Sequence, residues 1–137
     1  MLGSGAMSND IEGIADSDVI LVIGSNTTET HPVIGLRMVQ AAKQHGARII
    51  VADPRRIKLV DNARLWLNQK PGTDAALINA ICHVIVRDDL VDRDFIGNRT
   101  ENFEAFAASV AECTPEWAEK ITGVSAADIE EAGRRAG

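Results

Sequence analysis

The sequence predicts an α/β fold, in which a parallel sheet carries helices on both faces and is followed by a helical C-terminal extension. Residues 19–23 and 49–52 are short, β-branched apolar runs without alternation, a pattern that indicates strands buried on both faces. Helical periodicity between them makes a βαβ unit, whose strands lie parallel and whose crossover is right-handed. Beyond residue 90 the patterns are those of short helices. Together these observations predict a Rossmann-like, three-layer arrangement.

Length and composition fit a single globular domain. The chain has 137 residues, of which 45% are hydrophobic and 25% charged. No run approaches the roughly 20 consecutive apolar residues of a membrane span, and the start of the chain lacks the pattern of a secretory signal. We therefore expect a soluble, cytoplasmic segment without membrane contact. The net charge of −6 argues against nucleic acid as a partner, because phosphate neutralisation needs a basic surface.

The first half of the chain alternates strands and helices. Gly24-Ser25-Asn26 ends the first strand, and Pro32 suits the first turn of a helix that Gly46 stops. The second strand follows, and residues 65–67 predict a third, shorter one. A loop over residues 70–74 then opens an amphipathic helix, with Thr73 or Asp74 placed to cap it. The apolar face of that helix carries Leu77, Ile78, Ile81, Cys82 and Ile85.

The second half predicts four short helices. They lie around residues 94–96, over residues 103–110, from Thr114-Pro115 onward and from Ser125 onward, where Thr114 and Ser125 are ordinary helix-start residues. We divide the chain into an α/β module, residues 1–89, and a helical extension, residues 90–137, that packs on the same domain.

The cysteines and histidines predict neither a metal site nor a catalytic group. Cys82 and Cys113 are far apart and lack C-x-x-C partners, so they cannot build a zinc site or an iron–sulfur cluster, and Cys82 is expected to be a buried, inert thiol. His45 and His83 fit a helix end and a helix middle. His31, before Pro32, is the histidine placed to touch a ligand.

Three loops at the strand ends are the candidate binding edge: residues 24–31, 53–56 and 70–74. In an open parallel sheet, ligands bind outside the carboxyl ends of the strands. Gly24 permits close backbone approach, Ser25 and Asn26 supply polar side chains, and a helix N-terminus follows, which favours a phosphate or a polar group. The alternative is that these residues and Thr27 only turn the chain and cap the helix.

Asp53 and its neighbours suggest a nucleotide. Related folds place a carboxylate at the end of the second strand to accept hydrogen bonds from ribose hydroxyls, and an arginine fork such as that of Arg55 or Arg56 pairs with pyrophosphate. A surface turn begun by Asp53-Pro54 is the alternative.

If an aspartate of this edge, such as Asp74, meets a base, guanine is favoured over adenine; which of Asp53 and Asp74 meets guanine and which meets ribose stays open. Guanine presents two adjacent donors, which an ionised carboxylate can accept, whereas adenine offers an acceptor there. Helix capping explains Asp74 equally well, and Lys70 either adds charge near phosphates or is solvated. The first strand lacks the G-x-G-x-x-G fingerprint, which disfavours NAD.

Several motifs in order carry a family resemblance. They are residues 3–9, 22–26, 30–32, 51–55 and 71–74, continued by 95–96, 99–101, 113–116 and 121–125. With this order and spacing the chain resembles, over nearly its whole length, the large catalytic subunit of molybdenum- or tungsten-dependent formate dehydrogenases, within the dimethyl sulfoxide reductase superfamily of molybdopterin oxidoreductases.

The resemblance implies a site for one guanine dinucleotide limb of the bis(molybdopterin guanine dinucleotide) cofactor, with Mo or W in the parent enzyme. The positions that match the family's cofactor contacts are Asn26, Glu29, Ala52, Asp53, Arg55, Gly72 and Asp74. Together with the residues chosen on physical grounds, the predicted cofactor-binding set is Gly24, Ser25, Asn26, Glu29, His31, Ala52, Asp53, Arg55, Gly72, Thr73 and Asp74.

The resemblance also implies that this chain is an internal fragment. The family's iron–sulfur motif and its metal-ligating cysteine or selenocysteine would precede Gly3, and its later cofactor domains would follow Gly137. We expect a parent that oxidises formate to carbon dioxide and a fragment that is inactive alone, without catalytic or metal residues. Its partners would be the remaining domains of the large subunit and electron-transfer subunits. The alternatives are another molybdopterin oxidoreductase, such as a nitrate reductase, or a non-catalytic α/β interaction domain.

Overall fold

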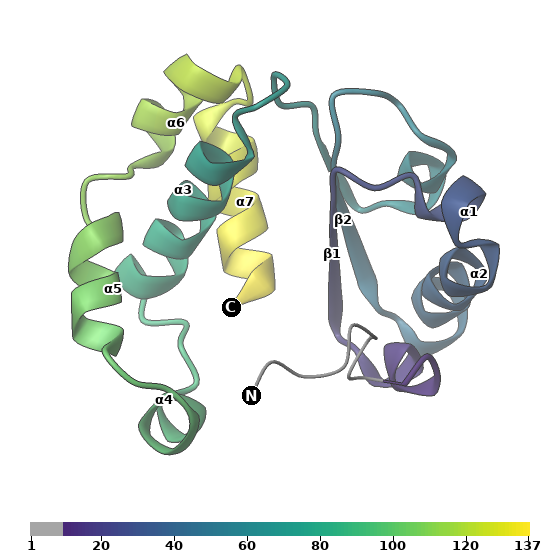
Figure 1. The fold of residues 1–137 in the computed structure, drawn as a ribbon, viewed down its shortest axis with the longest axis horizontal. Coiled ribbons are helices and arrows are strands. Elements are labelled where there is room, and N and C mark those ends of the chain that lie inside the picture. The colour runs from purple at the N-terminus through teal and green to yellow at the C-terminus, as the bar shows by residue number, and fades with distance from the viewer. Residues whose placement is uncertain (1–9) are drawn as a thin grey trace, which may run out of the picture.

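The computed structural model describes residues 10–137 and contains a sheet of three parallel strands (Figure 1). The strands lie in the order β1 (Val19–Ile23), β2 (Arg48–Ala52) and β3 (Leu65–Leu67). All pairings are parallel, as the βαβ pattern predicts. Motif residues 3–9 lie outside the described part of the chain.

The helices cover both faces of the sheet and then extend beyond it. The α-helices are α1 (Thr27–Thr30), α2 (Pro32–Gln40), α3 (Asp74–Arg87), α4 (Arg93–Arg99), α5 (Phe103–Val110), α6 (Pro115–Thr122) and α7 (Ala126–Ala136). Shorter helical segments are η1 (Glu12–Asp16), η2 (Ala41–His45) and η3 (Lys58–Asn62). The predicted start at Pro32 and the stop at Gly46, which adopts a φ of 78°, are confirmed.

Two hydrophobic clusters lie on opposite faces of β2. Ile49 and Val51 face the α2 side, where they pack with Ile57 and Leu59 of the β2–β3 connection. Ile50 and Ala52 face the other side, where they pack against residues of α3, α6 and α7. The three-layer prediction is therefore confirmed, and β2 is buried on both faces as expected.

β1 corrects one prediction, because it is not buried on both faces. It pairs only with β2 within residues 10–137, so it forms an edge of the sheet there. On the α7 side Val19 and Ile23 are only partly buried against the core, and Leu21 remains 42% exposed. A β-branched apolar run cannot by itself distinguish this half-covered edge from a central strand.

α3 confirms the predicted amphipathic helix, with Leu77, Ala80, Ile81 and Val84 buried. Ile78, predicted on the same face, is instead 39% exposed. α7 packs directly on α3 at Gly133, where a Cβ atom would lie 2.5 Å from Val84 Cβ. Arg87 at the end of α3 also donates to both oxygens of Glu130 in α7, at 2.7 and 2.9 Å.

The helices after residue 90 begin where the sequence predicts. Thr114 Oγ1 accepts from the Trp117 amide at 3.2 Å, and Ser125 Oγ accepts from the Asp128 amide at 3.1 Å, so both residues cap their helices. α6 and α7 contact α3, which joins this segment to the sheet layer. The division at residues 89 and 90 remains a prediction. Within the described chain, none of the helices has the length and apolarity needed to cross a bilayer.

Candidate functional site

The three predicted loops leave the sheet at the same edge. Ile23 pairs with Ala52, and Ala52 with Leu67, so the residues that follow β1, β2 and β3 are neighbours. The Gly24 amide donates to the Ala52 carbonyl at 3.0 Å and closes the sheet at this end. In Figure 1 these loops lie at the upper end of β1 and β2. Polar side chains from three separate sequence segments therefore share one edge.

The loop after β1 is an internally bonded turn. Asn26 Nδ2 donates to Glu29 Oε2 at 2.7 Å, while Asn26 Oδ1 accepts from the Thr28 hydroxyl at 3.2 Å. Asn26 stands at the N-cap position of α1 but its side chain makes no capping hydrogen bond. The alternative, in which this loop only turns the chain and caps the helix, is therefore wrong about the cap but not about the turn, and the loop contains a helical turn that the sequence did not indicate. Gly24 has a φ of 59° with open space where a Cβ would lie.

Two further residues complete this loop. Ser25 Oγ and Thr27 Oγ1 lie 3.1 Å apart, and Thr27 is 5% exposed, so the pair fixes the turn from inside. His31 is exposed and its Nδ1 lies 3.0 Å from the Thr30 hydroxyl. It lines a hollow of about 330 Å³ at the start of α2. Open space at His31 is thus on the α2 side of the loop.

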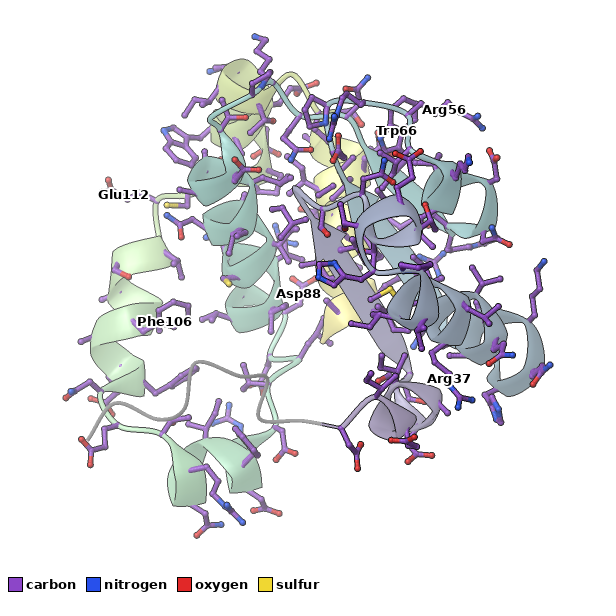
Figure 2. All side chains as sticks on the ribbon, turned by 45° about the vertical axis from the view of Figure 1, so that its right-hand side comes forward. Arg37, Arg56, Trp66, Asp88, Phe106 and Glu112 are labelled. Carbon is purple, nitrogen blue, oxygen red and sulfur yellow. The ribbon has the colours of Figure 1, made fainter. Side chains whose placement is uncertain are left out.

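Asp53 itself is buried, at 1% exposure, while residues 54–56 after it are exposed and form the turn that the alternative interpretation expected. Its Oδ1 accepts from the Arg55 amide at 2.8 Å, and the Arg55 Nε lies 3.5 Å from the same oxygen. Trp66, labelled in Figure 2 close to Arg56, donates its indole N–H to the Asp53 carbonyl at 2.9 Å. These contacts fix the carboxylate at the end of β2.

The arginines beside Asp53 have different partners. The Arg55 side chain is 72% exposed, so its guanidinium remains accessible from solvent. Arg56 instead pairs with Asp61 of η3 at 2.9 Å. Of the two, Arg55 is the better placed to meet an anion at the edge.

The loop after β3 corrects the predicted helix cap. Thr73 Oγ1 donates to the Lys70 carbonyl at 2.7 Å, and neither Thr73 nor Asp74 caps α3 through its side chain. Asp74 Oδ1 accepts instead from Gln69 Nε2 at 3.0 Å. Gly72 has a φ of 79°, and a Cβ at this residue would have nothing within 4 Å. The Asp74 carboxylate is therefore held by a neighbouring side chain at the N-terminus of the helix.

Gln69 and Trp66 are the residues that the sequence prediction missed. Burial alternates after β3, since Leu67 and Gln69 are buried while Asn68 and Lys70 are exposed. A glutamine at the inward position of this alternation is a signal for a buried polar contact, because buried polar groups are generally hydrogen-bonded.

The described residues contain no metal-binding or thiol chemistry at this edge. No group of three His, Cys, Asp or Glu side chains among residues 10–137 could hold a metal ion. Burial raises the pKa of the Cys82 thiol, which disfavours the reactive thiolate. His83 Nδ1 lies 3.0 Å from the Val110 carbonyl, away from the strand-end loops.

A larger hollow of about 920 Å³ lies at the opposite end of the strands and has a structural explanation. It is lined by charged residues of β2, α3 and α7, including Arg87, Glu130 and Arg134. These side chains pair with one another, at 2.7 Å for Arg87 with Glu130 and 2.8 Å for Arg134 with Glu130. The ion pairs that line this hollow therefore connect α3 to α7.

The fold and this edge define an open parallel α/β domain, the class in which ligands bind outside the carboxyl ends of the strands. Comparison with known proteins gives the particular family. The chain belongs to the molybdopterin oxidoreductase family, which it matches over residues 2–127. This membership implies a molybdopterin cofactor and confirms the predicted superfamily.

Individual relatives support the formate dehydrogenase resemblance. The chain is 52% identical to the F420-dependent formate dehydrogenase subunit alpha of Methanocaldococcus jannaschii, over 89% of this chain and 18% of that protein. It is 43% identical to formate dehydrogenase H of Escherichia coli, over 97% of this chain and 18% of that protein. Among solved structures, acetylene hydratase from Pelobacter acetylenicus superimposes with a TM-score of 0.77 at 31% identity, covering 90% of this chain and 19% of that one.

The chain thus spans about a fifth of the length of the proteins it matches. These proteins carry names for different reactions, formate dehydrogenation and acetylene hydration, although the same segment recurs in each. Similarity over this segment therefore does not by itself indicate which reaction the complete protein carries out.

Proposed function

We propose that the strand-end loops bind one guanine dinucleotide limb of a bis(molybdopterin guanine dinucleotide) cofactor, which carries Mo or W in the complete enzyme. The observation that carries this proposal is the pair of fixed acids at the edge: Asp53, 1% exposed at the end of β2, and Asp74 at the N-terminus of α3. Such an edge suits a ligand with both sugar hydroxyls and base donors.

The residues at the edge fit this group. In this proposal Asp53 accepts from ribose hydroxyls, and the Arg55 guanidinium, whose exposure supports such a role, pairs with pyrophosphate. Gly24 and Gly72 adopt positive φ and leave open space, so backbone amides can approach the ligand closely. Asp74 is placed to accept from guanine. Ser25, Asn26, Glu29, His31, Ala52 and Thr73 complete the proposed contact set.

For the complete protein we propose formate dehydrogenase activity, in which formate is oxidised to carbon dioxide. When bound, the cofactor supplies the two-electron chemistry, and the residues of this chain hold and orient it. The remaining domains of a large subunit, an iron–sulfur cluster and electron-transfer subunits are the partners that this activity needs, and the cytoplasm is the proposed compartment. The names of the relatives support this proposal.

Calorimetric titration of the 137-residue chain with GDP and ADP tests the binding site. We expect GDP to bind more tightly than ADP, and Asp53→Ala or Asp74→Ala to weaken GDP binding by about tenfold or more, the worth of hydrogen bonds to a charged group. The matched control is Asp61→Ala, an exposed acid that pairs with Arg56. Equal effects of all three substitutions would refute a specific nucleotide site.

A formate-dependent dye-reduction assay tests whether this chain alone is inactive. We expect no turnover by this chain alone, because the proposed site contains cofactor ligands but no catalytic residue. Turnover by the purified chain would contradict this. If the complete protein instead reduces nitrate and ignores formate, the alternative molybdopterin oxidoreductase replaces the proposed activity while the binding site stands.

A further inference from the structure

Gln69 lies behind Asp74 and is almost completely buried, at 1% exposure. The backbone beside it is fixed, because the Lys70 amide donates to the Thr122 carbonyl at the end of α6, at 2.8 Å. The side chain reaches Asp74 from this anchored position, and Nε2 donates to Asp74 Oδ1 at 3.0 Å. The contact therefore joins the end of β3 to the start of α3.

The orientation of the Gln69 amide follows from its partner. The opposite orientation would place Oε1 against a carboxylate oxygen, and two acceptors cannot share a hydrogen bond. The favourable orientation leaves Oε1 buried without a hydrogen-bond partner, the one such side-chain atom found in residues 10–137. An unpaired buried acceptor destabilises a fold, and methionine would fill a similar volume without one. The hydrogen bond from Nε2 to Asp74 is worth about as much as the unpaired Oε1 costs, so fold stability gives little net reason for a glutamine at this position.

The donor to the Asp74 carboxylate is the neutral amide of Gln69 and not a cation. No lysine or arginine of the described chain lies within ion-pair distance of its carboxylate. It lies at the N-terminus of α3, a helix of 14 residues whose dipole favours a negative charge there. The neutral Gln69 amide thus restricts the carboxylate without adding a compensating cation, and the carboxylate keeps its capacity to accept further hydrogen bonds.

We propose that Gln69 is a positioning residue that sets the base selectivity of this site. By holding Oδ1 of Asp74, it keeps the carboxylate plane in one orientation, in which both oxygens meet the two adjacent N–H donors of guanine. Adenine presents an acceptor beside its amine, so a fixed carboxylate rejects it, whereas a freely rotating carboxylate accepts from the amine of either base. This proposal rests on the proposed function and adds to it the residue that discriminates between bases.

The test compares Gln69→Met with Gln44→Met, a matched substitution of an exposed glutamine in η2. Each variant of the 137-residue chain is titrated with GDP and with ADP, and its melting temperature is measured. We expect Gln69→Met to reduce the preference for GDP over ADP about tenfold, the worth of one hydrogen bond to a charged group. Its melting temperature should change little, because removal of the unpaired acceptor offsets the loss of the hydrogen bond to Asp74. Gln44→Met should change neither.

Several outcomes would overturn the proposal. An unchanged GDP preference in Gln69→Met excludes a positioning role, and an equal loss of both nucleotides with a lower melting temperature indicates a purely structural role. If Gln69→Met does not fold, Gln69→Leu is measured in its place under the same criteria. If the wild-type chain shows no preference for GDP, or if Asp74→Ala retains that preference, the proposed function itself is refuted. If Asp74→Ala loses the preference but Gln69→Met keeps it, only the role of Gln69 is refuted.

Discussion

The packing of α7 on α3 makes Gly133 the position where an added methyl group should be most costly. In Gly133→Ala the new Cβ would lie 2.5 Å from Val84 Cβ and 2.6 Å from Val84 Cγ1. Carbon atoms pack at about 3.5 Å or more, so the helices must separate by about 1 Å. Overpacking costs about 1–3 kcal/mol, and the Val84 Cβ cannot move by a rotamer change, so the upper end applies. Alanine has a higher helix propensity than glycine, which offsets about 1 kcal/mol of this overpacking cost.

We therefore expect Gly133→Ala to lose about 2 kcal/mol of unfolding free energy and roughly 6 °C in melting temperature for a chain of this size. Urea denaturation followed by circular dichroism measures the first quantity, and calorimetry the second. Gly97→Ala in α4 is the control, because nothing lies within 4 Å of its Cβ and only the propensity gain remains. A second check is Val84→Ala, which removes the Cγ1 contact but keeps Cβ, so a double-mutant cycle should recover only part of the penalty. A Gly133→Ala chain as stable as wild type would refute the packing argument.

Three further predictions concern single side chains. Hydrogen bonds from Arg87 and, to a smaller extent, Arg134 lower the pKa of Asp88 to about 2, below its value in the unfolded chain. The stabilisation by the Asp88 carboxylate is therefore complete above the unfolded pKa and is lost as the pH falls toward 2. Urea denaturation midpoints between pH 6 and pH 2.5 should show this loss in the wild type, and the part of it due to Asp88 should be absent in Asp88→Asn. Trp66→Phe leaves the Asp53 carbonyl without its indole donor and should cost about 1 kcal/mol in unfolding free energy; a loss within error of zero would show that this bond is dispensable. Burial raises the pKa of the Cys82 thiol, so alkylation by iodoacetamide, followed by mass spectrometry at pH 8, should be slower at this residue than for free cysteine; an equal rate would contradict it.

Local patterns were sufficient to predict most of the fold. The apolar runs at residues 19–23, 49–52 and 65–67 each form a strand, and Thr114 and Ser125 each cap a helix. These signals depend on neighbours a few residues apart. Exposure of Leu21 depends instead on where helices distant in the sequence come to lie, and the apolar run carries no information about that.

The candidate site was predictable in position but not in its contacts. Strand-end loops were identified from the βαβ pattern, and Asp53 lies at the end of β2 as expected. Capping by Asp74 was the natural local interpretation, yet Gln69 competes for the carboxylate through a tertiary contact. Glu29 was predicted as a site residue only from the family resemblance, and the structure shows that its carboxylate accepts a hydrogen bond from Asn26. Side-chain pairs of this kind depend on backbone geometry that sequence spacing does not define.

The edge position of β1 has a consequence for how this sheet could grow. The connections from β1 to β2 and from β2 to β3 both run on the α2 face, whereas α3 lies on the opposite face. Right-handed crossovers on opposite faces advance in opposite directions along a sheet. A further parallel strand reached from the α3 face would therefore add beside β1. It would pair with the open edge of β1 and turn the Gly24 loop from the rim of the sheet into a topological switch point, where the strand order reverses and a crevice opens.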